Sequence, residues 1–493
     1  MKSNRRFFLK TGLAGAGALM TGSMLGRNEA NANSINSGAK NAAKSGSSVF
    51  NMCGYRAPKL DKVRIGFVGL GMRGPGAVTR MSHIEGVEIA ALCDQYSERV
   101  DKVVNKLSEN GIKKPKIYAG NEDSWKKMCE DPDLDLIYIT TPWKLHSDIC
   151  VYGMEHGKHV ATEVPAAETI EDCWRLVETS ERTKQHCVML ENCCYDDFEI
   201  LTLNMAQQGA FGELIHGEGA YIHDLLSLNF AKFEKKGNYA YADMWRLREN
   251  QHRNGNLYTT HGLGPVAQCM GLNRGDQADF LVSVSTNDFM MAEEAKKRAG
   301  EDSFYNEFTT NGYRGNMNTS TIRTVKGKTI MVQHDVTSAR PYSRIHLLSG
   351  TKAFARKYPT PGKIAFGHKF ATEEEMKELK DKYTPEIIKR VGDLAKQIGG
   401  HGGMDTVMDW HLIDNLRNGL PLAQDVYDAA LWSSIGPLSE HSVSHRSQTM
   451  EIPDFTRDNW RKNAPVDVNL KEGGNTKILQ LKKADKKSQL KVD

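Results

Sequence analysis

Short apolar runs alternate with amphipathic stretches between residues 61 and 195. Continuous apolar runs are typical of parallel strands that are covered on both faces, whereas amphipathic stretches of ten or more residues favour helices. The expected strands are 63–68, 87–94, 134–140, 159–162 and 188–192, and the expected helices are 75–83, 98–110, 145–156 and 170–184. This alternation predicts an α/β domain over 61–195 with a doubly wound parallel sheet.

The pattern changes after about residue 195. Apolar runs at 214–221, 280–285, 319–324, 329–335 and 343–348 follow one another without regular helical crossovers, and residues 325–328 form a plausible hairpin turn. They predict an α+β domain over 196–467 with a mostly antiparallel, open-faced sheet. Residues 371–394 indicate a charged helical insertion on the surface, and 404–418 and 422–435 indicate two further helices. The open face makes a homodimer a reasonable expectation.

A glycine-rich turn follows the first predicted strand. Gly69, Gly71 and Gly74 form a G-x-G-x-x-G sequence that opens a helix, and Asp94 ends the second strand 20 residues later. Glycines let the backbone approach a pyrophosphate at the helix N-terminus, and the acid can bind the ribose hydroxyls. The context of strand, turn, helix and acid predicts a Rossmann dinucleotide-binding domain. Because Asp94 would repel a 2′-phosphate, NAD is favoured over NADP.

Charge and cysteine content exclude several classes of function. The formal charge of +4 comes from residues 1–32, which hold five basic residues and one acid, so the remainder is about neutral. A basic surface for nucleic acid is therefore not indicated. The nine cysteines show no paired C-x-x-C spacing, so we expect neither a metal site nor a disulfide framework.

The N-terminus has the layout of an export signal. Arg5 and Arg6 precede an apolar run at 11–25, and Ala-Asn-Ala at 30–32 is a cleavage pattern. The paired arginines resemble a twin-arginine signal, although a general secretory signal is the alternative. We expect a signal peptide over 1–32, a flexible leader over 33–60, a basic solvated tail over 468–493, no stable membrane span and a bacterial periplasmic location.

Several segments at predicted strand ends resemble one enzyme superfamily. They are Gly-Phe-Val-Gly-Leu-Gly-Met-Arg-Gly at 66–74, Thr-Pro-Trp-Lys-Leu-His at 141–146, Glu-Val-Pro at 163–165, Glu-Asn at 191–192 with Tyr195, Trp-Arg at 245–246, Tyr-Thr-Thr-His at 258–261 and Gly-Gly-His-Gly-Gly-Met-Asp at 399–405. Over residues 62–440 the chain resembles the glucose–fructose oxidoreductase and inositol dehydrogenase superfamily. Within it, the sequence is most similar to the NAD-dependent glycoside hydrolase family 109, the α-N-acetylgalactosaminidases.

Two positions depart from the patterns of these families. The dehydrogenases usually carry Glu-Lys-Pro, whose lysine assists oxidation of a carbinol, but Val164 stands in the lysine position here. The glycosidase branch resembles this sequence at that position. Thr259 replaces a proline that is frequent in the family, while Tyr258 and His261 are kept.

The resemblance implies a function for a defined set of residues. It implies hydrolysis of terminal α-N-acetylgalactosamine by oxidation at C3, elimination of the C1 substituent after loss of the C2 proton, addition of water and reduction, with NAD regenerated. Tyr195, Tyr258 and His261 are the catalytic candidates. The expected substrate-binding residues are Tyr221, Arg246, Tyr258, Thr259, Thr260, His261 and Tyr342. The expected NAD-binding residues are Gly69, Gly71, Met72, Arg73, Gly74, Asp94, Trp143, Lys144, Leu145, His146, Glu163, Val164 and Asn192.

Two alternatives stay open from the sequence. The first is an NAD-dependent sugar dehydrogenase, which would need another acid–base group in place of the missing lysine. The second is a sugar-binding or NAD-binding protein without catalysis. A dehydrogenase would accumulate reduced cofactor with free sugar, and a redox-neutral glycosidase would not.

Overall fold

The computed structural model describes residues 50–234, 239–310 and 312–479. Its first sheet holds six parallel strands in the order β3-β2-β1-β4-β5-β6. The strands are β1 (Val63–Val68), β2 (Val87–Asp94), β3 (Lys116–Ala119), β4 (Leu136–Ile139), β5 (His159–Thr162) and β6 (Cys187–Met189). This order confirms the predicted doubly wound Rossmann sheet.

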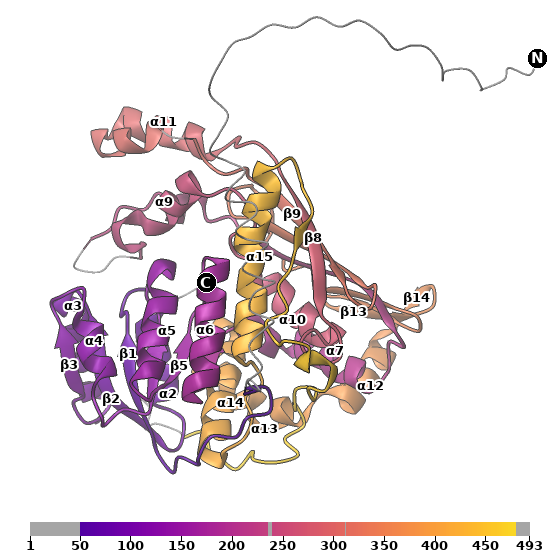
Figure 1. Cartoon of the computed structure of the whole chain (residues 1–493), viewed down its shortest axis with the longest axis horizontal. Helices are drawn as coiled ribbons and strands as arrows, with labels where there is room; N and C mark the ends of the chain where they lie inside the picture. The colour runs from indigo at the N-terminus through magenta and orange to yellow at the C-terminus, as the bar shows by residue number, and fades with distance from the viewer. Residues whose placement is uncertain (1–49, 235–238, 311, 480–493) are drawn as a thin grey trace, which may run out of the picture. The chain divides into compact units, whose positions relative to one another are not determined.

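Helices connect and cover these strands (Figure 1). They are α2 (Gly74–Met81), α3 (Ser97–Glu109), α4 (Ser124–Cys129), α5 (His146–Glu155) and α6 (Ile170–Thr183). Helix α5 packs between α4 and α6, while α2 contacts α14 (Met404–Asn418), which also reaches β1. The sequence analysis missed β3 and α4. Strand β3 has no buried residue, so it lacks the apolar run that marks the other strands.

The second sheet has nine strands in the order β14-β13-β12-β11-β7-β10-β9-β8-β15. They are β7 (Leu214–Ile222), β8 (Ala278–Ser285), β9 (Asn318–Thr324), β10 (Thr329–Asp335), β11 (Leu347–Gly350), β12 (Phe354–Arg356), β13 (Lys363–Phe366), β14 (Lys369–Phe370) and β15 (Met450–Glu451). Only the pairing of β7 with β10 is parallel among these described strands. The mostly antiparallel character is therefore confirmed.

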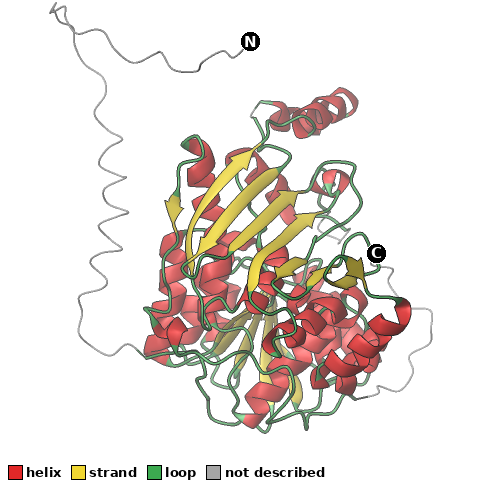
Figure 2. Cartoon of the chain, turned by 90° about the vertical axis from the view of Figure 1, so that its right-hand side faces the viewer, coloured by secondary structure: helices red, strands yellow, loops and turns green. Residues whose placement is uncertain are grey.

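One face of this sheet carries no helix over its central strands (Figure 2). Ile215 on β7 and Val284 on β8 are two large apolar side chains that are more than half exposed, at 51% and 60%. The open-faced sheet is as predicted, and the homodimer that we expected from it stays a prediction.

Two helices hold the second sheet against the rest of the protein. Helix α10 (Thr260–Met270) packs on β7, and a Cβ on Gly219 of β7 would lie 2.1 Å from the carbonyl oxygen of Gly262. Only glycine at both positions lets the helix approach the strand so closely. Helix α15 (Val426–Ser444) contacts α6 and β6 on one side and β8 on the other, so it joins the two sheets (Figure 1).

The remaining helices are shorter or lie at the periphery. The α-helices are α7 (Asp197–Gln207), α8 (Leu226–Asn229), α9 (Trp245–His252), α11 (Met291–Glu301), α12 (Glu373–Tyr383) and α13 (Glu386–Ile398). The 3₁₀ turns are η2 (Trp143–Leu145), η3 (Asn192–Tyr195), η4 (Ala242–Met244), η5 (Ser303–Thr309), η6 (His401–Gly403) and η7 (Asn459–Arg461).

Two elements differ from the sequence-based expectation. The strand expected at 343–348 begins only at Leu347, because Ile345 and His346 have positive φ values of 58° and 45°, which interrupt an extended strand. The helix expected at 371–394 is two helices, α12 and α13, which are separated by Thr384 and Pro385. Helix α13 buries one apolar face against α14, so only α12 has the surface character that we expected for the whole segment.

The described ends of the chain pack against the core. The N–H of Met52 donates to the Tyr427 hydroxyl at 3.1 Å, and the indole N–H of Trp410 donates to the Thr476 carbonyl at 3.0 Å. Residues 50–60 and 468–479, assigned above to the leader and the tail, are thus in contact with the domains. The predicted signal peptide, the first part of the leader and the end of the tail lie outside the described residues.

None of the described helices is long and apolar enough to cross a membrane. All nine cysteines lie within the described ranges, and each is a free thiol.

Candidate active site

A cleft of about 920 Å³ runs from the carboxyl ends of the parallel strands to the C-terminal end of β7 in the second sheet. Most of the predicted site residues line it. These are Gly69, Gly71, Met72, Arg73, Asp94, Trp143, Lys144, Leu145, His146, Glu163, Val164, Asn192, Tyr221, Arg246, Tyr258 and His261. Gly74, Tyr195, Thr259, Thr260 and Tyr342 do not line the cleft. The roles that the resemblance implies for all of these residues stay predictions.

The turn between β1 and α2 needs glycine at two positions. Gly69 has a φ of 89°, and a Cβ there would lie 2.7 Å from the carbonyl carbon of Thr140. A Cβ on Gly74 would lie 2.1 Å from the carbonyl oxygen of Gly69. Glycine at these positions therefore allows the turn to close tightly, and Gly69 and Gly71 line the cleft, where a dinucleotide site needs the backbone to approach a pyrophosphate.

Asp94 lies beside this turn at the end of β2. Its carboxylate accepts hydrogen bonds from the N–H groups of Leu70 at 2.6 Å and Tyr96 at 2.9 Å. Burial raises the pKa of Asp94, while these two hydrogen bonds and Arg99 oppose that rise. Arg99 also lines the cleft, 3.2 Å from a Cβ on Gly71, where it can neutralise a phosphate. The sequence analysis missed Arg99, because an arginine in an amphipathic helix gives no distinguishing signal.

A buried ionic network lies under the middle of the cleft. Arg73 donates to the Glu163 carboxylate at 2.9 Å, and its guanidinium is 3.4 Å from Asp405. The Asn192 amide donates to Asp405 at 2.5 Å. Burial opposes ionisation of Asp405, but Arg73 and Arg80 hold the pKa of its carboxyl well below the usual range. These pairs fix the Arg73, Glu163 and Asn192 side chains at the wall of the cleft.

His146 has no ring nitrogen free for acid–base chemistry. Its Nδ1 is 2.7 Å from the carbonyl oxygen of Pro165, and its Nε2 is 2.8 Å from that of Thr141. Burial lowers the pKa of this histidine. We therefore interpret His146 as a residue that shapes the cofactor side of the cleft.

Aromatic side chains surround Arg246, which lines the cleft from helix α9. The Arg246 guanidinium lies 4.6 Å from the ring centre of Tyr258 and 5.2 Å from that of Trp143. It donates one hydrogen bond, to the Tyr241 hydroxyl at 2.8 Å. Within the described parts of the chain it makes no ion pair with a carboxylate, although it is 94% buried. Its Nη2 is buried and has no hydrogen-bond partner in the described structure, so the guanidinium has donor capacity left over.

Tyr221, Tyr258 and His261 form one cluster next to Arg246. Their rings are 4.8 to 5.2 Å apart, and all three line the cleft. Burial raises the pKa of both tyrosines, and Arg246 opposes that rise. The sequence analysis did not single out His223, whose Nδ1 is 2.9 Å from the Tyr221 hydroxyl. It also left out His401, which lines the cleft 3.1 Å from Arg73.

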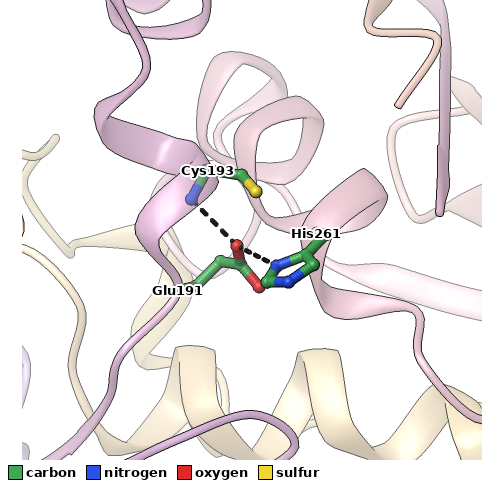
Figure 3. Close-up of side chains that lie close together, drawn as sticks. All are labelled: Glu191, Cys193 and His261. Carbon is green, nitrogen blue, oxygen red and sulfur yellow. Dashed lines mark hydrogen bonds and ion pairs between the residues drawn. The ribbon is translucent and has the colours of Figure 1, made fainter. Parts of the chain in front are cut away.

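A buried carboxylate contacts His261 from behind (Figure 3). Glu191 is fully buried, and its Oε1 accepts from His261 Nδ1 at 2.7 Å and from the Cys193 N–H at 3.0 Å. The sequence analysis gave Glu191 no role, although its place after the last parallel strand was a usable signal. Glu191, Cys193 and His261 lie close enough for a metal site. However, two ligands of one zinc ion lie about 3.3 Å apart, so the short Nδ1–Oε1 contact is a hydrogen bond.

The other predicted residues lie behind the cleft wall or at its edge. The Tyr195 hydroxyl is 3.2 Å from Nδ1 of buried His411, and the Thr259 hydroxyl donates to the Trp432 carbonyl at 2.9 Å. Thr260 is buried at the start of α10. Tyr342 is 38% exposed and accepts a hydrogen bond from Arg344 at 3.1 Å. Tyr195 therefore needs a rearrangement to reach a substrate, whereas Tyr258 and His261 do not.

Comparison with known proteins places both halves of the chain. Residues 63–191 match the family of oxidoreductases with an NAD-binding Rossmann fold, and residues 195–462 match the C-terminal domain of glycosyl hydrolase 109. A glycosyl hydrolase family 109 protein of Porphyromonas gingivalis is 47% identical over 421 residues, which cover 82% of this chain and 87% of that one. An alpha-N-acetylgalactosaminidase of Bacteroides fragilis is 49% identical over 412 residues, covering 83% and 95%.

The fold also has relatives among solved structures. Levoglucosan dehydrogenase in complex with NADH and L-sorbose has a TM-score of 0.60 and 15% identity, over 80% of this chain and 100% of that one. At this identity the likeness concerns the fold alone. The family matches and the cleft together give the identity: the chain belongs to glycosyl hydrolase family 109 and is an NAD-dependent glycoside hydrolase.

Proposed function

We propose that the enzyme hydrolyses terminal α-linked N-acetylgalactosamine by a redox-neutral route in which NAD is unchanged after each turnover. The observation that carries this proposal is that one cleft joins the dinucleotide turn to a sugar-facing wall of Tyr221, Arg246, Tyr258 and His261. An ordinary glycosidase would present two carboxylates to the scissile bond. Here Glu163 is paired with Arg73, and Asp94 accepts two backbone N–H groups.

When bound, NAD supplies a reversible two-electron acceptor for the C3 carbinol of the sugar. The chain must then provide a base for the proton of the C3 hydroxyl and a base for the C2 proton, which the C3 carbonyl makes acidic. Tyr258 and His261 are the groups that we assign to these proton transfers, because both face the cleft within one cluster. The C1 substituent leaves with a proton on its oxygen, water restores the hydroxyl at C1 and the proton at C2, and return of the hydride to C3 with a proton on its oxygen restores the carbinol. The sum of the steps is therefore hydrolysis.

Val164 supports a glycosidase over a dehydrogenase. It lines the cleft immediately after Glu163, where the dehydrogenases of the superfamily carry a lysine. The Val164 side chain cannot take up or release a proton, so proton transfer must come from the wall of the cleft that holds Tyr258 and His261. Arg246 lies on that wall with unused donors, which suits the hydroxyl and acetamido oxygens of a neutral sugar.

The test uses protein purified without added NAD. Nitrophenol release from 4-nitrophenyl α-N-acetylgalactosaminide is followed together with the absorbance of reduced nicotinamide. We expect turnover without accumulation of reduced cofactor. Accumulation of reduced cofactor from free sugar and added NAD, without nitrophenol release, would overturn the proposal and leave a dehydrogenase. Binding of NAD or sugar without either reaction would leave a binding protein.

We also propose that the protein is exported by the twin-arginine route to the periplasm. The support is the paired Arg5 and Arg6 ahead of an apolar run. Replacing both arginines by lysine should retain the protein in the cytoplasmic fraction while the wild type reaches the periplasm. Equal export of the two proteins would contradict the proposal.

A further inference from the structure

We propose that Glu191 is a positioning residue that fixes the ring orientation and tautomer of His261, so that Nε2 is the basic atom presented to the cleft. This inference rests on the proposed function for the identity of the reaction, although the geometry of the pair does not depend on it. Glu191 caps the turn η3 that follows β6, and His261 lies in the first turn of α10, so the pair also links the two domains.

The hydrogen bond decides which nitrogen of His261 carries the proton. An ionised carboxylate only accepts hydrogen bonds, so the 2.7 Å contact requires the proton on Nδ1. In neutral histidine Nε2 then has a free lone pair. His261 is 14% exposed and lines the cleft, whereas Glu191 is 0% exposed. The carboxylate thus acts through the imidazole and does not itself touch a substrate.

Packing keeps Glu191 in place. Its Oε1 also accepts from the Cys193 N–H, which fixes the carboxylate to the turn after β6. A Cβ on Gly264, three residues after His261 on the same helix, would lie 2.9 Å from Glu191 Cγ and 3.1 Å from the Trp432 ring. The side chain therefore lies in a space that the absence of a side chain at Gly264 leaves open.

The charge of Glu191 has no other counterion in the described structure. Several other buried carboxylates are matched by arginine, as in Asp428 with Arg274 and Glu199 with Arg344. His261 is the one ion-pair partner found for Glu191 among the described residues. Burial would raise the pKa of Glu191, but His261 and the hydrogen bonds hold it below the usual value. A carboxylate in this position stabilises the imidazolium that forms when Nε2 takes a proton.

The first arm of the test needs no turnover. The full chain is labelled with ¹⁵N-histidine, and the His261 signals are assigned by their loss in His261→Gln. We expect protonated Nδ1 and unprotonated Nε2 in the wild type and a shift toward the other tautomer in Glu191→Ala. An unchanged tautomer in Glu191→Ala would overturn the inference, even if the enzyme proved not to be a glycosidase.

The second arm uses kinetics and the isosteric variant Glu191→Gln. We expect kcat to fall between about 10²- and 10⁴-fold with a small change in KM, as when a carboxylate behind a catalytic histidine becomes an amide. The acid limb of the kcat profile should move to lower pH, because the imidazolium loses its carboxylate. Glu191→Asp should recover part of the lost rate.

The matched control is Asp428→Asn, which neutralises a buried carboxylate away from the cleft. This variant should lower the melting temperature. It should leave the pH profile of kcat unchanged, and it should not lower kcat selectively over KM as Glu191→Gln does. If Glu191→Gln behaves like this control, Glu191 is merely structural and the inference fails. If the wild type shows no nitrophenol release, the proposed function fails while the tautomer arm still decides the inference.

Discussion

The two sides of the cleft are built in different ways. The cofactor side consists of backbone turns at strand ends and of ion pairs such as Arg73 with Glu163 and Asp405. The sugar side consists of single side chains from separate elements, including an arginine without a carboxylate and a histidine backed by one. We infer that the glycine turn on the cofactor side depends on the space around its backbone, whereas the sugar side depends on individual polar side chains. Substitutions that introduce a steric clash should therefore impair the cofactor side, and substitutions that remove a single polar group should impair the sugar side.

The largest effect is expected from His261→Gln. Removing a general base costs about 10²- to 10⁴-fold in rate. We expect kcat for the nitrophenyl glycoside to fall by that factor, while the Kd of NAD from tryptophan fluorescence stays unchanged. His368→Gln, on the exposed turn between β13 and β14, is the control. A parallel loss of NAD affinity in His261→Gln would show that the two sides are not separable.

The next effect is expected from Gly69→Ala on the cofactor side. A Cβ at this positive-φ position would contact the Thr140 carbonyl, with strain of about 1–3 kcal/mol. We expect at least a tenfold weaker Kd for NAD and a lower melting temperature. Gly76→Ala, within helix α2 where the new methyl group meets only the Arg80 guanidinium at an ordinary contact distance of 3.4 Å, should leave both quantities near the wild type. Equal behaviour of the two variants would disprove the steric account.

A smaller effect is expected from Arg246→Lys. Lysine keeps the charge but loses the planar donor fork and the stacking on Tyr258. Loss of a charged hydrogen bond of about 1.5–3 kcal/mol corresponds to a KM increase of roughly 10- to 100-fold. Binding of NAD should not change. Arg323→Lys on β9 is the exposed control, and an unchanged KM in Arg246→Lys would remove this residue from sugar recognition.

The smallest effect is a loss of stability of the whole protein at acidic pH, which should not distinguish the cofactor side from the sugar side. Burial lowers the pKa of His159 and of His411 to about 4, and neither histidine lines the cleft. Each is neutral when folded and titrates near 6.5 when unfolded, so its contribution is complete above that pH and is lost as pH falls toward about 4. Chemical denaturation should show a falling free energy of unfolding between these values, with a shallower slope in His159→Phe.

The same division explains what the sequence could predict. Strands β1 and β2 have the predicted bounds, because an apolar run bounded by a glycine turn or an acid is a local signal. The position of Glu191 after a strand was a local signal, but its contact with a histidine of another domain, like the place of Arg99 at the cleft, became visible only in the tertiary structure. Tyr195 shows the reverse case. Its place near a strand end made it a candidate, but its hydroxyl faces His411.

The contact between Gly219 and Gly262 has a consequence for engineering this enzyme. Because the two backbones touch, the spacing between β7 and α10 does not depend on the size of any side chain at the contact. Tyr221 follows Gly219 by two residues, and His261 precedes Gly262. On the proposed roles, substitutions at Tyr221 or Arg246 should change the shape of the pocket while His261, the base that we propose, keeps its position.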